Sequence, residues 1–326
     1  MAGAIAQRFT ALGGLSWCGV PVTDDLPTTN GDGRYNDFAS SCSIYWSAAS
    51  GAHAVSGAVR NRWIGLGAEQ SLLGYPTRDL ALTASRTGYI AVFQKGVIYH
   101  SGTTGTRYLT SPILPKYRSI GAETSQLRYP TTDTRATASG AGRYQHFQDG
   151  SIFWSSDSSA HVVTGTIRSL WASPGWERSW LGYPTIDVTL TASRNGYVAR
   201  FQGGAVYASG PTGAHYVRDA ILSRYTAMKA EASYLRYPTT NTNATASGVG
   251  RYQHFQGGSM FWSSGTGAHP VTGAIRTAWA KLGWERSWLG YPKSDPYTVT
   301  VGIRQNFQHG YLVWNRSTGA VRAYSS

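Results

Sequence analysis

The chain has 326 residues, of which 41% are hydrophobic and 14% charged, and no apolar run approaches the ~20 residues that a membrane-spanning helix needs. Low charge together with 39 glycines, 21 tyrosines and 12 tryptophans favours short strands joined by tight turns over long surface helices. The formal net charge of +13, carried mainly by arginine, allows an anionic partner, but the positive residues are scattered rather than gathered in a basic run.

An internal repeat dominates the sequence. The motif Ala-His-x-Val-Ser/Thr-Gly occurs at 52–57, 160–165 and 268–273, an interval of 108 residues, and degenerate copies lie halfway between these sites. The repeating unit therefore has 54 residues. Six units account for one repeat domain over 3–326, and they are 3–56, 57–110, 111–164, 165–218, 219–272 and 273–326.

Each unit is predicted to begin with a helix and to continue as a small antiparallel sheet. Ile275, Trp279 and Leu282 have helical spacing, and Gly283 can end that helix. A Leu-Gly-Tyr-Pro corner follows, where proline prevents the helix from continuing. Two strands then pair around a glycine-containing turn, as at 144–148 and 151–154 about Asp149 and Gly150, and an extended piece such as 161–163 leads into the next helix.

Two further markers recur with the same period. The corner, in the form Leu-Gly-Tyr-Pro or Leu-Arg-Tyr-Pro, lies at 73–76, 127–130, 181–184, 235–238 and 289–292, with a divergent copy at 18–21. A phenylalanine is present in every unit: Phe38, Phe93, Phe147, Phe201, Phe255 and Phe307.

A unit of this kind cannot bury its apolar face alone, so neighbouring units must pack against each other. A linear array needs polar caps at both ends, yet the sixth unit stays close to the consensus. We therefore predict a mainly β fold with short helices, arranged as a propeller-like closed ring, with an open superhelical array as the alternative.

The corners, the Phe-Gln-Gly-Gly turns at 201–204 and 255–258, and the Gly-Ala-His-x-Val strands together resemble LGFP repeats. The resemblance covers essentially the whole chain. LGFP repeats occur in secreted actinobacterial proteins, often beside cell-wall hydrolases, esterases or mycoloyltransferases. The resemblance therefore implies a propeller-like fold, carbohydrate binding and a role in anchoring to cell-wall polysaccharide. Here the repeats have no catalytic domain beside them, which leaves a free-standing lectin as a second form of that function.

Catalysis requires one asymmetric cluster of polar groups, whereas this chain repeats its polar residues. It has no Gly-x-Ser-x-Gly elbow, His-Glu-x-x-His motif or phosphate-binding Gly-Lys-Ser loop. We therefore expect no enzyme activity and no cofactor. The repeated histidines, such as His53, lack the local spacing of a zinc site and are interpreted as structural. The recurrent acid three residues after the corner proline, Asp79 for example, is interpreted as a turn former rather than a calcium ligand.

The aromatic residues give the sharpest functional hypothesis. Four tryptophans follow the second strand of the hairpin, and since adjacent strand residues face opposite ways, each could present an outward platform. Sugar rings stack on such platforms while neighbouring polar groups bind their hydroxyls. Packing between units is the competing interpretation. The predicted ligand-binding residues are Trp46, Trp154, Trp262, Trp314, Arg143, Gln145, His146, Arg251, Gln253 and His254.

Other residues are assigned to structure. Five tryptophans of the helices and corners are interpreted as packing residues: Trp63, Trp171, Trp180, Trp279 and Trp288. Cys18 and Cys42, both in the first unit, could form a disulfide that holds an irregular terminal repeat.

The expected function is thus non-catalytic binding of a polysaccharide or glycan, neutral or anionic, through repeated shallow sites. Avidity would compensate for weak individual sites. A basic module that binds anionic polymers or nucleic acid is the alternative, and a protein scaffold or a hydrolase ranks lower. No signal peptide is recognisable after Met1. Secretion or attachment to the cell envelope is expected, a cytosolic location remains open, and no membrane span is predicted.

Overall fold

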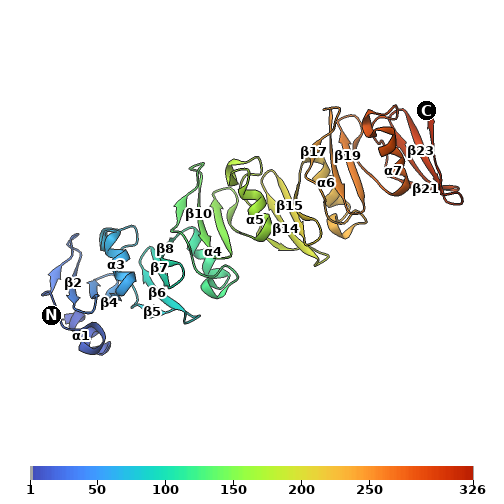
Figure 1. Ribbon diagram of the computed structural model, residues 1–326. Coiled ribbons are helices and arrows are strands. Elements are labelled where there is room, and N and C mark those ends of the chain that lie inside the picture. The colour runs from blue at the N-terminus through green and yellow to red at the C-terminus, as the bar shows by residue number, and fades with distance from the viewer. Residues whose placement is uncertain (1–2, 326) are drawn as a thin grey trace. The chain divides into compact units, whose positions relative to one another are not determined.

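A computed structural model describes residues 3–325. The chain divides into two compact units, residues 1–162 and 163–326, and the boundary falls within strand β12 (Ser159–Thr164). Each compact unit carries three of the six repeats, and in each repeat a helix precedes a four-stranded sheet (Figure 1).

In the first compact unit, the described elements follow the predicted order of helix, corner and hairpin. The helices, including the short 3-10 turns η1 and η2, are α1 (Gly3–Ala11), α2 (Leu15–Cys18), α3 (Gly57–Gly65), η1 (Ala68–Gln70), α4 (Ile113–Ser119) and η2 (Ala122–Thr124). The strands are β1 (Leu26–Pro27), β2 (Gly33–Phe38), β3 (Cys42–Ser47), β4 (Gly51–Ser56), β5 (Ala81–Leu82), β6 (Gly88–Phe93), β7 (Gly96–Ser101), β8 (Gly105–Thr110), β9 (Arg135–Ala136), β10 (Gly142–Phe147), β11 (Gly150–Ser155) and β12.

The second compact unit repeats this order. Its helices are α5 (Gly165–Ala172), η3 (Trp176–Arg178), α6 (Asp219–Ala227), η4 (Ala230–Ala232), α7 (Gly273–Leu282) and η5 (Trp284–Arg286). Its strands are β13 (Thr189–Leu190), β14 (Gly196–Phe201), β15 (Gly204–Ser209), β16 (Gly213–Val217), β17 (Asn243–Ala244), β18 (Gly250–Phe255), β19 (Gly258–Ser263), β20 (Gly267–Val271), β21 (Tyr297–Val299), β22 (Gly302–Phe307), β23 (Gly310–Asn315) and β24 (Val321–Ser325).

The predicted elements are present, with two differences. Helix α7 ends where expected, because Gly283 adopts a left-handed φ of 102° at its C-terminus. The hairpin turn, however, consists of Gln148 and Asp149, since Gly150 already pairs with Phe147 in the ladder. A short strand that the sequence did not predict, such as β9, also pairs with the first hairpin strand.

The strands form six separate four-stranded sheets within residues 3–325, and each sheet contains four consecutive strands. All the strand pairs described are antiparallel, as in the ladder of β18 and β19. The mainly β architecture of helix-plus-hairpin repeats is therefore confirmed. Closure of the sheets into a ring stays a prediction.

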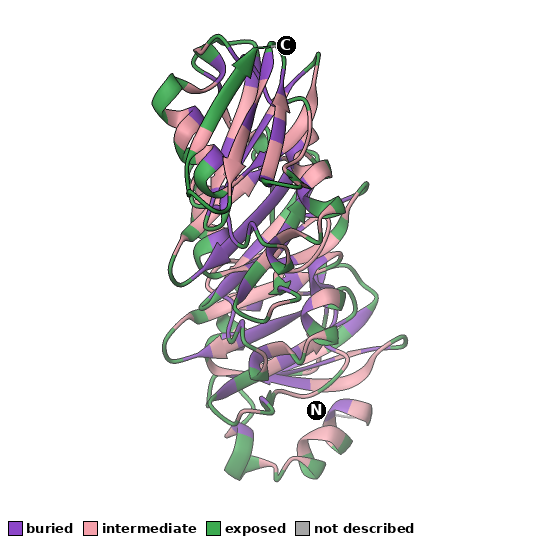
Figure 2. Ribbon diagram, turned by 90° about the vertical axis from the view of Figure 1, so that its right-hand side faces the viewer, coloured by how far each residue is buried: buried purple, intermediate pink, exposed green. Residues whose placement is uncertain are grey.

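Within each compact unit, the core lies between consecutive sheets, with a helix inserted between them. In the second compact unit, Tyr207 of one sheet, Tyr225 of α6 and Phe255 of the next sheet belong to one buried cluster. Residues in the central strands are buried, shown in purple in Figure 2. A sheet that lies between two others in its compact unit therefore packs both of its faces, and each large side chain fully buried there contributes roughly 1.5–3 kcal/mol.

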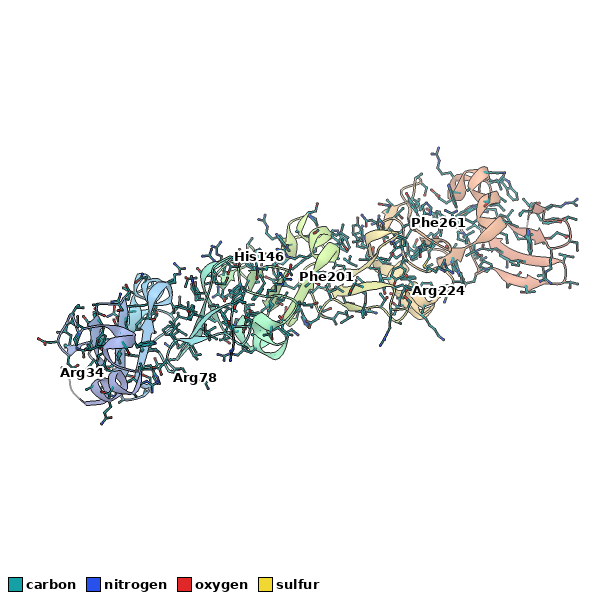
Figure 3. The ribbon with its side chains drawn as sticks, turned by 60° about the horizontal axis from the view of Figure 1, so that its bottom comes forward. Arg34, Arg78, His146, Phe201, Arg224 and Phe261 are labelled. Carbon is teal, nitrogen blue, oxygen red and sulfur yellow. A yellow bond between two sulfur atoms is a disulfide. The ribbon has the colours of Figure 1, made fainter. Side chains whose placement is uncertain are left out.

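The corner motif and the recurrent phenylalanine, which the sequence marked separately, are paired in the structure. The proline of every corner forms an isolated antiparallel bridge to the phenylalanine of its own repeat, as Pro184 does with Phe201, labelled in Figure 3. Leu181 and Phe201 are both buried. The corner thus fixes the chain leaving each helix against the first hairpin strand.

Cys18 of α2 and Cys42 of β3 form a disulfide with a Cα–Cα distance of 5.3 Å. Both cysteines are buried in the small core of the first repeat, where Ile5 and Phe38 also lie. The disulfide thus joins the segment after α1 to the first sheet.

Candidate functional site

The four hairpin tryptophans predicted as outward platforms are half-buried. Trp154 packs against the cluster that contains Ile152 and Phe147, and Trp262 packs against the cluster of Phe255 and α6. Trp46 and Trp314 likewise border buried clusters. The simple alternation of inward and outward residues fails here because both faces of a sheet are covered by its neighbours.

The strand register brings two of the predicted arginines to the predicted tryptophans. Arg143 lies directly opposite Trp154, and Arg251 directly opposite Trp262. The pair of Trp314 is Ile303, so the sixth repeat lacks the arginine. In the first repeat Arg34 lies opposite Trp46, and these two residues line a cleft of about 290 Å³.

The predicted histidines lie on the other face of the sheet from these tryptophans. Each histidine is an odd number of residues along its strand from the arginine that pairs with the tryptophan, and side chains alternate between the two faces. The ring of His146, labelled in Figure 3, lies 4.9 Å from that of Tyr144. His254 lines an aromatic cleft of about 260 Å³ with Tyr252, Phe261 and Trp284. Burial first, and then the charge of Arg276, lowers the pKa of His254 below its ordinary value.

The predicted glutamines do not lie on the candidate surface. Gln145 and Gln253 are completely buried, with 0% exposure. The side-chain nitrogen of Gln253 donates to the carbonyls of Tyr216 and Thr240 at 3.1 and 2.8 Å, and its oxygen accepts from Thr242 at 2.6 Å. Gln145 makes the equivalent bonds. These amides bind backbone and have no access to a ligand.

Two tryptophans interpreted from the sequence as packing residues are exposed instead. Trp180 is 39% and Trp288 is 48% exposed, and Tyr234, at the same corner position between them, is 56% exposed. We call these three residues the corner aromatics. Helical spacing does correctly mark Trp63, Trp171 and Trp279, which are fully buried. The position of the corner aromatics lies outside the helix. In other repeats it holds Leu72 or Gln126, and this variation in polarity indicates that the position is not buried in the core.

The surroundings of Trp180 show what a corner aromatic offers. The guanidinium carbon of Arg218 lies 4.6 Å from the centre of the Trp180 ring. Tyr216 packs edge-on to the same ring at 4.8 Å. The indole is therefore held in place by a cation and a second aromatic ring while part of it remains open to solvent, an arrangement suited to apolar ring faces that also carry polar groups.

A second recurrent feature is a polar cleft beside each of three corners. The clefts have volumes of about 440, 520 and 750 Å³, and their linings include Glu69, Glu123 and Glu231 respectively. We call them the corner clefts. Their lining is equivalent in the three repeats, with a corner tyrosine, a hairpin glutamine and a strand-end serine around the glutamate. The residues of these types are Tyr75, Gln94 and Ser47, then Tyr129, Gln148 and Ser101, and then Tyr237, Gln256 and Ser209.

Hydrogen bonds across the repeats hold the cleft walls. Glu231, only 7% exposed, accepts from the backbone N–H of Ser193 at 3.2 Å. The hydroxyl of Tyr237 lies 2.5 Å from that of Thr191 and 2.9 Å from that of Ser193. The sequence analysis did not single out the recurrent glutamate, although its regular spacing was visible at Glu69, Glu123, Glu177, Glu231 and Glu285.

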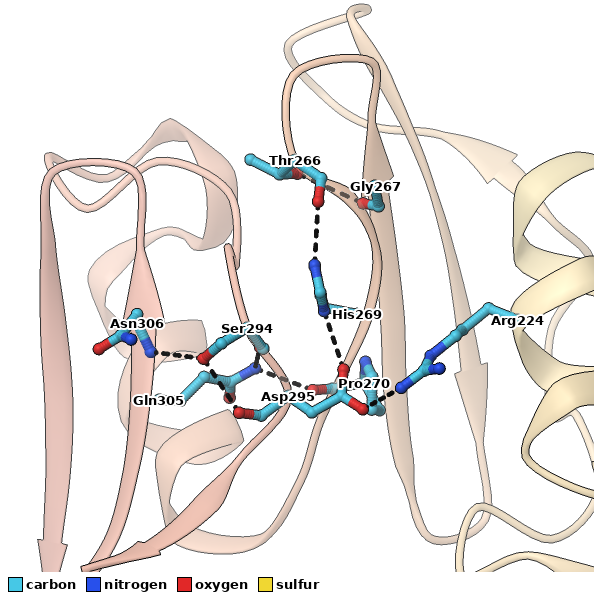
Figure 4. Close-up of polar contacts among 9 residues, drawn as sticks. All are labelled: Arg224, Thr266, Gly267, His269, Pro270, Ser294, Asp295, Gln305 and Asn306. Carbon is cyan, nitrogen blue, oxygen red and sulfur yellow. Dashed lines mark hydrogen bonds and ion pairs between the residues drawn. The ribbon is translucent and has the colours of Figure 1, made fainter.

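The recurrent acid after the corner proline joins repeats, as the close-up of Asp295 shows (Figure 4). Asp295 is paired with Arg224 of α6 and lies 2.8 Å from Nδ1 of His269, whose Nε2 donates to the carbonyl of Thr266 at 2.9 Å. Burial opposes ionisation of Asp295, but His269 and Arg224 together lower its pKa. The equivalent Asp133 accepts from the backbone N–H of Tyr108 at 3.0 Å. The acid thus has a structural role, but it binds the preceding repeat and not its own turn.

Residues 3–325 contain no group of three or more histidine, cysteine, aspartate or glutamate side chains placed to hold a metal ion. None of the helices in this range combines the length and apolarity required to cross a membrane.

The fold and its recurrent sites define a tandem-repeat protein. The model of the LGFP repeat matches six times, at residues 19–71, 73–125, 127–179, 181–233, 235–287 and 289–325. The chain therefore belongs to the LGFP-repeat family. No curated protein matches it.

Among solved structures, the Cps50 (Swd1) β-propeller domain of Myceliophteria thermophila is similar with 10% identity and a TM-score of 0.15, over 93% of this chain and 82% of that one. The AfRom2 CNH domain has 7% identity and a TM-score of 0.15, over 93% and 84% of the two chains. Similarity this low carries no argument about fold or function.

Proposed function

We propose that the protein is a non-catalytic carbohydrate-binding repeat protein, acting as a cell-envelope polysaccharide anchor or a secreted lectin. The observation that carries the proposal is the exposure of an aromatic side chain at the same corner position in three successive repeats, Trp180, Tyr234 and Trp288. Exposed aromatic rings that recur at a fixed sequence interval are suited to binding a polymer built of repeating units. Several weak stacking contacts on one scaffold add up to useful avidity.

The stacking chemistry suits sugar rings. A pyranose presents an apolar face of C–H groups, which packs on an indole or phenol, and its hydroxyls need donors and acceptors nearby. Arg218 stands beside Trp180. The corner cleft of the fifth repeat, whose lining includes Ser233 next to Tyr234, contains carboxylate, amide and hydroxyl groups. The Arg143–Trp154 and Arg251–Trp262 pairs remain a second candidate surface for the same function, less open because their tryptophans are half-buried.

The test is a glycan-array screen of the whole protein with three sets of substitutions. The first replaces the corner aromatics (Trp180→Ala, Tyr234→Ala and Trp288→Ala together), and the second replaces Trp154→Ala and Trp262→Ala. The control changes the same corner position where it is not aromatic, Leu72→Ala with Gln126→Ala. We expect the first set to weaken binding by at least about tenfold, since stacking on one aromatic ring is worth ~1 kcal/mol. The control should bind as the native protein does.

Binding lost only in the second set would move the site to the hairpin tryptophans. No glycan bound by the native protein would refute the proposal. The alternative function, a basic module for anionic polymers or nucleic acid, is favoured by the net charge of +13. It predicts affinity that falls steeply between about 50 and about 500 mM salt, whereas binding of a neutral glycan should hardly change.

The closed ring is proposed as the scaffold for these sites, with the open superhelical array as its alternative. In a ring, each corner aromatic would occupy an equivalent place around one axis. In an array, the corner aromatics would follow its length. Location in the envelope or outside the cell is part of the same proposal, as the family resemblance implies.

A further inference from the structure

The residue that follows the recurrent corner leucine has an unusual backbone conformation in five repeats. Its φ is positive at Gly74, Gly182 and Gly290, with values of 72°, 67° and 71°, and equally at Arg128 and Arg236, with values of 55° and 54°. Glycine adopts this left-handed conformation without steric cost, whereas an arginine there is strained. Two repeats therefore keep a strained arginine where three others have the relaxed residue.

Packing against the neighbouring hairpin makes glycine the natural residue at this position. A Cβ added at Gly74 would lie 2.4 Å from the side-chain oxygen of Gln94, and one added at Gly182 would lie 2.4 Å from that of Gln202. In the arginine repeats the equivalent Gln148 and Gln256 keep their hydrogen bonds to the corner, at 3.1 and 3.2 Å from the backbone nitrogens of Tyr129 and Tyr237. The corner thus retains its bonds but has to accommodate a larger residue.

Both strained arginines line corner clefts, and these clefts are the larger ones. Arg236 lines the cleft of about 750 Å³ and Arg128 the cleft of about 520 Å³, while Gly74 lines the cleft of about 440 Å³. Both arginines are exposed, whereas Glu231 and Glu123 in the same clefts are buried. Each cleft is therefore lined by a solvent-exposed arginine and a buried glutamate.

The charge of these arginines is available to a ligand. Arg236 forms no ion pair with any carboxylate in the described part of the chain. The equivalent Arg128 lies 3.1 Å from Asp149, but the two side chains are 67% and 52% exposed, and so exposed a pair is weak and exchangeable. A strained backbone at a cleft, together with an exposed planar donor that is unpaired or only weakly paired, is the pattern of a ligand-binding position.

We propose that the Arg128 and Arg236 clefts bind a singly charged anionic group, a carboxylate or a phosphodiester, on a glycan. The arginine binds the anion in bidentate fashion, and the wall glutamate accepts hydrogen bonds from hydroxyls of the same sugar. The inference rests on the proposed function in taking a glycan as the ligand. It adds that the two arginine repeats select for acidic residues along the polymer.

The experiment compares two double variants with the same change of charge and the same relief of backbone strain. Arg128→Gly with Arg236→Gly changes the clefts. The control, Arg86→Gly with Arg194→Gly, replaces two arginines whose φ values of 57° and 58° are also left-handed. They adjoin the lining residues Thr87 and Ser193 in the chain but are not themselves part of the lining of the clefts, so the control keeps the change of charge near each cleft and leaves the lining intact. The probes are polygalacturonate, its methyl-esterified neutral form and a poly(glycerol phosphate), measured by isothermal titration calorimetry and supplemented by melting temperatures.

We expect the cleft variant to bind an acidic probe at least about tenfold more weakly than the control variant, which is the usual effect of losing a charge-assisted bidentate pair. Its melting temperature should not fall, because glycine relieves strain at both sites. The acidic probe that shows this difference identifies the anion as carboxylate or phosphodiester. Equal binding of the acidic probes by both variants would overturn the inference while leaving neutral-glycan binding intact. If the native protein bound none of the probes and nothing on the glycan array, the proposed function would fail and this inference with it.

Discussion

At the level of single residues, the buried glutamines of the first hairpin strand connect three segments of chain. Gln253 binds Tyr216 on the preceding sheet, Thr240 in the corner loop and Thr242 beside it. Gln305 makes the corresponding bonds to Pro270 and Ser294 (Figure 4). A long polar side chain is retained inside the core because it donates hydrogen bonds to backbone carbonyls of two neighbouring segments.

We predict that Gln253→Ala destabilises the protein by about 3 kcal/mol, because it empties a fully buried site, removes three hydrogen bonds and leaves the carbonyl of Thr240 without a partner. Urea unfolding followed by tryptophan fluorescence measures the change in free energy of unfolding. Gln126→Ala, at an exposed corner position, is the control and should change it by less than ~0.5 kcal/mol. A similar loss in the two variants would show that the buried network contributes little.

Stability is also expected to depend on pH through His254. Burial and Arg276 lower the pKa of His254 in the folded protein, so the unfolded chain takes up a proton at a higher pH than the folded one. The contribution is therefore fully present above about pH 6.5, the ordinary histidine value, and is lost as the pH falls towards the folded pKa. Unfolding free energies at about pH 7.5 and about pH 5.5 should differ less in His254→Gln than in the native protein. His309→Gln, at an exposed site, should keep the native difference.

At the level of elements, the periodic markers predicted most of what the structure contains. Ile275, Trp279 and Gly283 place helix α7 and its end, because helical spacing and a terminal glycine have direct physical meaning. The exposure of Trp180 and the burial of Gln253 could not be predicted in the same way. Both depend on how one repeat packs against the next, and a pattern within one strand or corner does not contain that information.

The first repeat has the smallest of the described clusters, and its disulfide closes a loop with a sequence separation of 24 residues. Chain-entropy arguments give a contribution of about 3 kcal/mol for such a loop. We predict that Cys18→Ser with Cys42→Ser accelerates amide hydrogen exchange in residues 3–56. The sixth repeat, residues 273–325, is the control within the same molecule and should exchange as before. Unchanged protection in the first repeat would mean that its apolar contacts suffice.

At the level of the whole molecule, the closed ring makes a numerical prediction. A compact chain of 326 residues should have a radius of gyration of about 20 Å. Small-angle X-ray scattering of the monomer measures this quantity directly. A value well above it, with the distance distribution of an elongated particle, would favour the open superhelical array and overturn the ring. Adding a bound oligosaccharide would then show whether the ligand alters the arrangement of the repeats.

Within residues 3–325, each sheet is built from four strands that are consecutive in the chain, and no strand leaves its repeat to complete another sheet. A duplication or deletion of one 54-residue block in the gene therefore adds or removes an entire sheet with its helix, and breaks no ladder of hydrogen bonds. Unequal recombination between the similar segments can change the number of repeats in one step. The length of polymer that the protein can contact, and the number of corner clefts with arginine, would then be set by the number of repeats. Both can change without any change inside a single repeat.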